Sequence, residues 1–105
     1  MDYYNWDDGL AVPTAVATHP ACDLAIALKL FWLAEGQFWH DPNVEVDAYN
    51  FQHFNFCTMI EGRIISGFYE VGRLSHTQNF NKAVIYKLEK SGFPEILYKP
   101  VVGRE

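Results

Sequence analysis

One apolar segment limits the folds that are open to this chain. Residues 24–34 read LAIALKLFWLA, a run of strong helix formers in which Lys29 carries the only charge. Asp23 before the run is a typical N-cap residue, and we expect Gly36 after it at the C′ position, where helices often end in a left-handed conformation. A helix that is apolar almost all round must be covered on several sides. The sequence therefore predicts a central helix in a packed protein.

Helices are also predicted on both sides of this segment. Residues 10–18 favour a short helix that begins near Val12 or Pro13 and ends by His19, because Pro20 disfavours a helical conformation in the residue before it. Residues 37–47 are expected to form a loop or broken turn around Asp41-Pro42-Asn43, with Phe38 and Trp39 packed against the body.

The segment 50–69 is ambiguous between a helix and a hairpin. Its apolar residues fit one helix face, but a hairpin of residues 54–60 and 63–69 around Glu61-Gly62 has similar support, because periodicity does not separate short apolar runs. The residues of the helix face are Phe54, Cys57, Ile60, Ile64 and Phe68.

A further helix is predicted over KAVIYKLEKS, residues 82–91, with Asn79 or Asn81 as its N-cap. Gly92 is expected to end it in the left-handed conformation, and Phe93 to fold back on Ile85 or Leu88. Its inward-facing residues are expected to be Val84, Ile85 and Leu88. The tail from residue 95 is predicted to be a short extended segment or a packed strap. The fold class is therefore mainly α: one domain over residues 1–105, a bundle of about four helices with minor extended structure at the C-terminus.

The charge is distributed unevenly along the chain. Residues 1–50 contain eight acidic residues against Lys29 alone, a net charge of −7, whereas residues 51–105 contain five acidic and seven basic residues, a net charge of +2. A general nucleic-acid binder is disfavoured because phosphate contacts need clustered Lys and Arg. The acidic half instead favours a protein partner with a basic surface. The candidate partner-binding patch combines aromatic and acidic residues: Tyr3, Tyr4, Trp6, Asp7, Asp8, Glu45 and Asp47.

No catalytic, cofactor-binding or metal site is predicted. Asp7-Asp8 lacks the ligand spacing of a calcium loop, the four histidines lack zinc spacing, and no phosphate-binding loop is present. His53 and Cys57 lie one helical turn apart, but Cys57 falls on the apolar stripe, where thiols are usually inert. Cys22 and Cys57 are expected to be reduced and buried rather than paired, and His19 is expected to fasten the turn before Pro20. Whether either thiol is reactive stays open at this point.

The chain shows no targeting signal and no membrane span. Its N-terminus, MDYYNWDDG, is acidic where a secretory signal is basic and then apolar. The apolar run of residues 24–34 is far shorter than the roughly 20 residues that cross a bilayer. We therefore expect a cytoplasmic protein.

The first third of the chain resembles a known family. Residues 5–9 read NWDDG, residues 19–23 read HPACD, and the ALKLFW run of residues 27–32 is followed by Gly36. These motifs are similar to the signature of a bacterial family known as domain of unknown function 4274. Weaker likeness continues in GFY, residues 67–69, and in YKLEKSGFPEI, residues 86–96. The resemblance implies a small, mostly helical domain, favours the helix for residues 50–68, and implies no activity.

Together these observations favour a non-catalytic, cytoplasmic protein-binding domain of a bacterium. The more specific hypothesis is an immunity protein that neutralises a toxin through its acidic surface, since such a surface can compete for the nucleic-acid site of a cationic nuclease. The alternative is a small ligand-binding, metal-binding or enzymatic domain that uses the Asp7/Asp8 loop with His19 or His40. A structural accessory module is a third possibility that the sequence does not separate from these.

Overall fold

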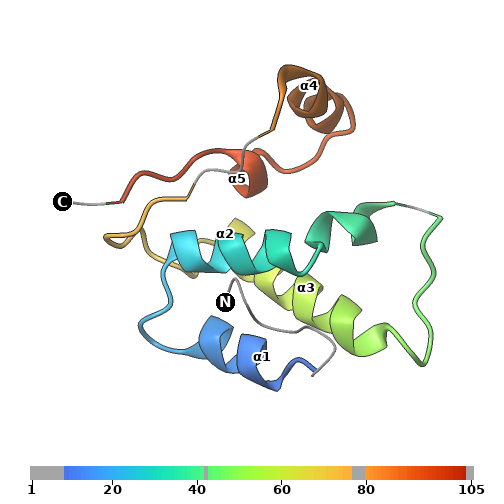
Figure 1. Cartoon of the computed structure of the whole chain (residues 1–105), viewed down its shortest axis with the longest axis horizontal. Helices are drawn as coiled ribbons and strands as arrows, with labels where there is room; N and C mark the ends of the chain where they lie inside the picture. Colours follow the sequence, from blue (N-terminus) through green and yellow to red (C-terminus); the bar gives the residue numbers. More distant parts are fainter. Residues whose placement is uncertain (1–8, 42, 77–79, 104–105) are drawn as a thin grey trace.

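A computed structural model describes residues 9–41, 43–76 and 80–103 of the chain. Over these residues the structure consists of helices joined by irregular segments (Figure 1). The mainly α prediction is therefore confirmed, although η2 and α5 were not foreseen. The elements are α1 (Ala11–Thr18), α2 (Leu24–Leu33), the 3-10 helix η2 (Gly36–His40), α3 (Phe51–Ile65), α4 (Lys82–Lys90) and α5 (Glu95–Tyr98).

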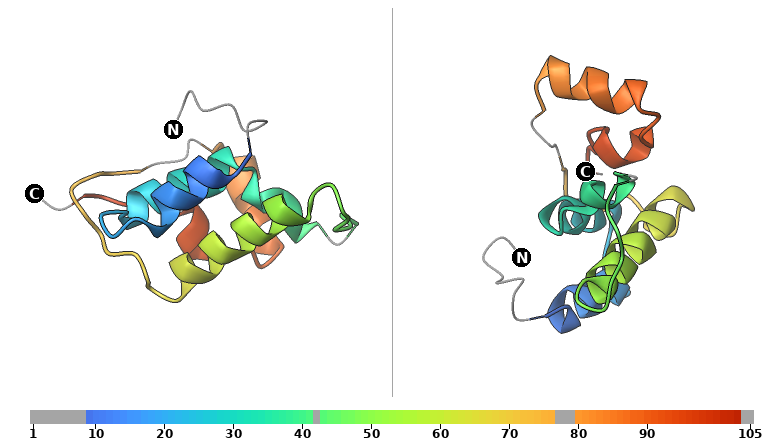
Figure 2. Two further views of the ribbon diagram at one scale, coloured as in Figure 1. Left: turned by 90° about the horizontal axis from the view of Figure 1, so that it is seen from below. Right: turned by 90° about the vertical axis from the view of Figure 1, so that its right-hand side faces the viewer.

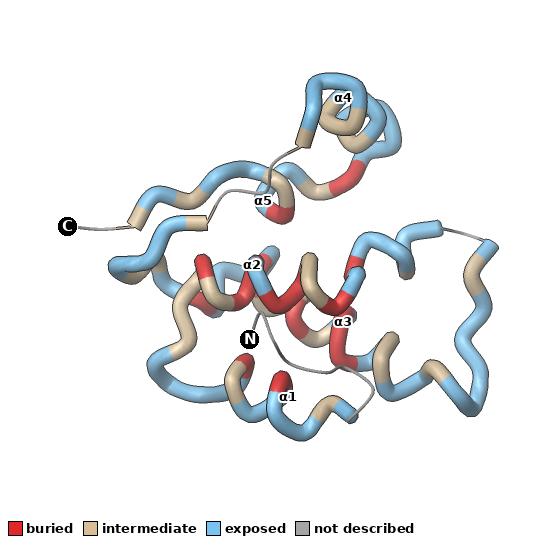
Figure 3. Tube along the Cα trace, viewed as in Figure 1, coloured by how far each residue is buried: buried red, intermediate tan, exposed pale blue. Residues whose placement is uncertain are grey.

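Helix α2 lies at the centre, as its apolar sequence predicts. It contacts α1, α3 and η2, and its buried residues form the core together with those of α3 (Figure 3). Two views at right angles show α4 on the far side of α2 from α1 (Figure 2). The buried residues of α2 are Ala25, Ala27, Leu28, Leu30 and Phe31.

The start of α2 follows the prediction, but its end does not. The Asp23 side chain accepts a hydrogen bond from Ile26 N at 3.0 Å, so Asp23 is the N-cap. The left-handed residue after the helix is Glu35, with φ of 56°, and the prediction that Gly36 takes this conformation is wrong. Gly36 is needed for a different reason. A Cβ at this position would lie 2.2 Å from the Phe31 ring, so only glycine allows the backbone to pass this close to the ring.

Residues 51–65 form the helix α3, and the hairpin alternative is wrong. Its buried face contains Phe56, Cys57, Ile60 and Ile64, while Phe54 is half-buried. Phe68 does not extend this face, because Gly67 turns the chain with φ of 79° and Phe68 N donates to Arg63 O. The Phe68 ring is exposed instead and lies 4.5 Å below the Arg63 guanidinium, a cation–π contact.

Helix α4 ends as the sequence predicts but is poorly covered. Asn81 caps its start by accepting from Val84 N at 2.9 Å. At its end Gly92 has φ of 77° and Phe93 N donates to Leu88 O, which together form a Schellman motif. The Phe93 ring is buried among Phe31, Trp32 and neighbouring rings. The three inward-facing residues of α4 are only half-buried.

The two outer segments match their predictions in part. Residues 36–40 form η2 rather than a loop; Trp39 packs against the core, but Phe38 is 52% exposed and its predicted packing is wrong. The C-terminal tail contains α5 and then a strap in which Val101 pairs with His76 in an isolated antiparallel bridge.

We predict opposite outcomes for alanine at two helical glycines. Gly36→Ala places a methyl group against the Phe31 ring and should lower the free energy of unfolding by about 1–3 kcal/mol, the usual cost of overpacking. Gly62→Ala in α3 meets no atom within 4 Å and should raise it by about 0.5–1 kcal/mol through helix propensity. Urea denaturation measures both values, and a neutral Gly36→Ala variant would contradict this packing.

Candidate functional site

The segment between η2 and α3 is mostly exposed. We call Asp41 and residues 43–50 the acidic loop; it contains three carboxylates and no basic residue. Its described residues are exposed except for Val44 and Asn50. Figure 1 shows the loop as a green trace that extends to one end of the molecule. The predicted patch residues Glu45 and Asp47 both lie on it.

The acidic loop is held by hydrogen bonds of its own. Asp47 Oδ1 accepts from Tyr49 N at 2.8 Å and from Asn50 N at 3.0 Å, while Asp47 N donates to Asn50 Oδ1 at 2.7 Å. The Asn50 side chain also donates to Glu45 O at 3.0 Å. Asp41 Oδ1 accepts from Asn43 N at 2.9 Å. These bonds give the loop a defined conformation.

The same loop exposes a large aromatic side chain. Tyr49 is 99% exposed, and Val46 and Phe51 beside it are 47% and 44% exposed. Tyrosine is among the residues enriched at protein interfaces. Sequence reasoning did not single out Tyr49. The available signal was its position two residues before the start of α3, outside the apolar spacing of the helix.

The other predicted patch residues lie outside the described residues. They are Tyr3, Tyr4, Trp6, Asp7 and Asp8. Of the predicted patch, only Glu45 and Asp47 are described, and both lie on the acidic loop. That the N-terminal residues belong to the same patch stays a prediction. The Asp7/Asp8 metal alternative also falls outside the described residues. Within them, no group of three or more metal-ligating side chains is present.

His53 and Cys57 share one structural task. His53 Nε2 lies 2.6 Å from Ala34 O, and Cys57 Sγ donates to the same carbonyl at 3.7 Å. Both side chains therefore fasten α3 to the C-terminal end of α2, where helix carbonyls lack helical partners. Burial raises the pKa of the Cys57 thiol to about 12, which keeps it protonated at neutral pH. This arrangement favours a structural pair over a nucleophile and its base.

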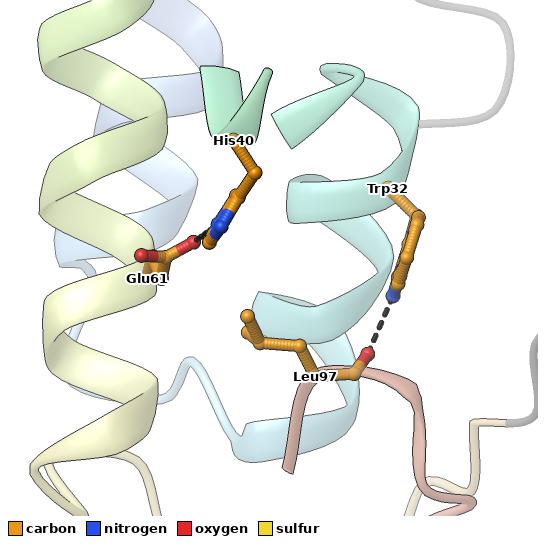
Figure 4. Close-up of polar contacts among 4 residues, drawn as sticks. All are labelled: Trp32, His40, Glu61 and Leu97. Carbon is orange, nitrogen blue, oxygen red and sulfur yellow. Dashed lines mark hydrogen bonds and ion pairs between the residues drawn. The ribbon is translucent and has the colours of Figure 1, made fainter. Parts of the chain in front are cut away.

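His40 is bound to α3 rather than to its neighbour Asp41. Its Nε2 pairs with Glu61 Oε1 (Figure 4). Its ring also packs against Phe93. The cavity beside this pair measures about 130 Å³, well below the roughly 300–1,000 Å³ of small-molecule sites. His40 thus connects η2 to α3.

The HPACD motif of residues 19–23 forms the turn between α1 and α2. His19 Nδ1 accepts from Ala21 N at 3.0 Å, which confirms its predicted role, and Asp23 caps α2. Gly72 packs against Asp23, because a Cβ on Gly72 would lie 2.4 Å from Asp23 Oδ2. Cys22 is half-buried and unpaired, and burial raises its pKa to about 11. The motif residues of this turn are therefore used for folding.

A comparison with family models shows which protein family the chain belongs to. A model described as a domain of unknown function, DUF4274, matches residues 1–65. The chain belongs to the DUF4274 family. Because the match ends at residue 65, the likeness of residues 67–69 and 86–96 stays a prediction. Neither the comparison with curated proteins nor that with solved structures gives a match for this DUF4274 chain. None of its described helices is long and apolar enough to cross a membrane.

We predict that both thiols are nearly inert in the folded protein. With the pKa raised to about 11 in Cys22 and about 12 in Cys57, fewer than about one thiol in 1,000 is a thiolate at pH 7.5. Iodoacetamide should modify both cysteines within minutes in 8 M urea and neither in buffer, as read by mass spectrometry. Fast modification of Cys57 in the folded protein would contradict its burial and its contact with Ala34 O.

Proposed function

We propose that this DUF4274 chain is a protein-binding domain and that its acidic loop docks on a partner with a basic surface. The observation that carries the proposal is Tyr49, which is 99% exposed within a loop of three carboxylates. A tyrosine in this setting supplies a contact of the hot-spot type, and the carboxylates around it select a cationic partner.

The internal hydrogen bonds of the loop support the proposal through the cost of binding. A loop that must become ordered on association loses conformational entropy, which subtracts from the affinity. Asp47 and Asn50 already hold the chain through four hydrogen bonds that involve their side chains. The residues that would contact the partner are thus presented in a fixed arrangement.

The charge distribution supports a more specific role. Residues 1–50 carry a net charge of −7, and the acidic loop lies in this half. Within the proposal, the chain is a bacterial immunity protein that acts in the cytoplasm. It binds a cationic toxin, and its carboxylates occupy the surface that the toxin would otherwise use for nucleic acid. Charge complementarity of this kind raises the association rate and excludes other partners.

The first test uses the product of the gene directly upstream of this one as the partner. The two proteins are co-expressed, and the affinity is measured by calorimetry at 50 and 300 mM NaCl. We expect a stable complex that weakens at the higher salt, because exposed charges are screened over about a Debye length. If the purified proteins do not associate at 50 mM NaCl, the immunity role is wrong.

The second test places the interface on the acidic loop. Glu45→Lys should weaken the complex about tenfold by placing a cation against the basic partner, and Tyr49→Ala should cost about 2 kcal/mol. The loop uses Glu45 through its backbone carbonyl, so the substitution leaves that bond in place. Glu89→Lys in α4 makes the same charge change at another exposed position and should leave the affinity unchanged. Equal effects of the two charge reversals would contradict a localised interface.

A further inference from the structure

A second surface of the molecule, away from the acidic loop, is hollowed. One side of α2 and residues 74–76 enclose a groove of about 470 Å³, within the range of small-molecule sites. Helix α2 supplies Lys29 and an apolar floor that includes Ile26 and Trp32, and Leu74, Ser75 and His76 form the opposite wall. In Figure 1 this wall lies at the opposite end of the molecule from the acidic loop.

Both sides of the groove are fixed by hydrogen bonds. On the floor, Trp32 Nε1 donates to Leu97 O at 2.6 Å (Figure 4), and the indole makes an edge contact with Phe80. In the wall, the backbones of His76 and Val101 exchange two hydrogen bonds of 2.9 and 2.8 Å. The groove is thus formed before any ligand enters, which lowers the cost of binding.

The electrostatics of the groove oppose those of the surrounding chain. Among the eight described residues that line it, none is a carboxylate and one is a cation, Lys29, which is the only basic residue in the first 50. In an acidic protein this makes the groove a local site for a negative group. The exposed side chain of Leu74 adds apolar surface to the opposite wall.

The wall also contains a polar atom of His76 that has no partner among the described residues. This atom is Nε2, which is buried. Burial, with a smaller effect of Lys29, lowers the pKa of His76, so the ring is neutral at pH 7.5 and carries one donor and one acceptor nitrogen. A buried polar group without a partner costs free energy, and in this structure His76 Nε2 lies behind the groove surface rather than on it.

We propose that this groove binds a small organic anion, a carboxylic acid with an apolar tail. The carboxylate lies at Lys29, and the tail packs on Ile26, Trp32 and Leu74. The negative carboxylate complements the charge of Lys29, and the apolar tail covers the floor residues Ile26 and Trp32, which solvent otherwise contacts. This site is separate from the acidic loop and does not depend on the function proposed for it.

The test is a titration of the ¹⁵N-labelled protein by NMR at pH 7.5 and constant ionic strength. The probes are 3-phenylpropionate and its uncharged analogue 3-phenylpropanamide, which share the same tail. We expect saturable shifts of the amides of residues 25–33 and 74–76 with the acid, with a dissociation constant on the order of 1 mM for so small a ligand. The amide should bind about tenfold more weakly, because it lacks the charge-assisted contact. Equal affinities, or shifts outside these residues, would overturn the proposal.

Substitutions of Lys29 separate charge from packing. Lys29→Met keeps the aliphatic stem and should weaken 3-phenylpropionate about tenfold, whereas Lys29→Arg keeps the charge and should restore most of the affinity. Lys82→Met in α4 removes an exposed lysine elsewhere and serves as the matched control. The unbound spectra establish that each variant is folded. Unchanged affinity in Lys29→Met, with a folded spectrum, would show that the groove does not select an anion.

Discussion

The structure depends on covering α2. Its ten residues include one charge, so almost every side of the helix must be removed from water. Helices α1 and α3 cover two sides of α2, and η2 contacts it as well. The Phe93 ring packs against Phe31 and Trp32 of α2. Two close contacts set the geometry of this cover: the approach of Gly36 to the Phe31 ring, and the shared use of Ala34 O by His53 and Cys57.

Local sequence rules predicted the elements better than their packing. The caps at Asp23 and Asn81 and the stop at Gly92 were correct because each depends on a few neighbouring residues. Gly36 was assigned to the wrong role, since its requirement comes from a ring five residues away in sequence whose position depends on tertiary structure. The prediction that Phe68 lies on the buried face of α3 was wrong for a related reason. Its spacing fits that face, but the chain leaves the helix at Gly67, before Phe68.

The candidate sites show the same division. Composition placed the negative charge in the first half, and Glu45 and Asp47 are indeed exposed on one loop. Position outside the apolar spacing of α3 was the one signal for Tyr49, and its full exposure follows from the course of the loop. The groove beside α2 was beyond sequence reasoning altogether, because Lys29 and His76 are 47 residues apart in the chain and are brought together by the pairing of residues 76 and 101.

Helix α4 has a consequence for the way the fold opens. None of its residues is buried, and its apolar side chains are half-covered at most. Its amide hydrogen bonds are therefore protected by little packing, and local opening there costs far less than global unfolding. We therefore expect the amides of α4 to exchange with solvent faster than those of α2 and α3, whose buried faces form the core. The chain thus combines a rigid centre with one helix that can detach and reform without loss of the core.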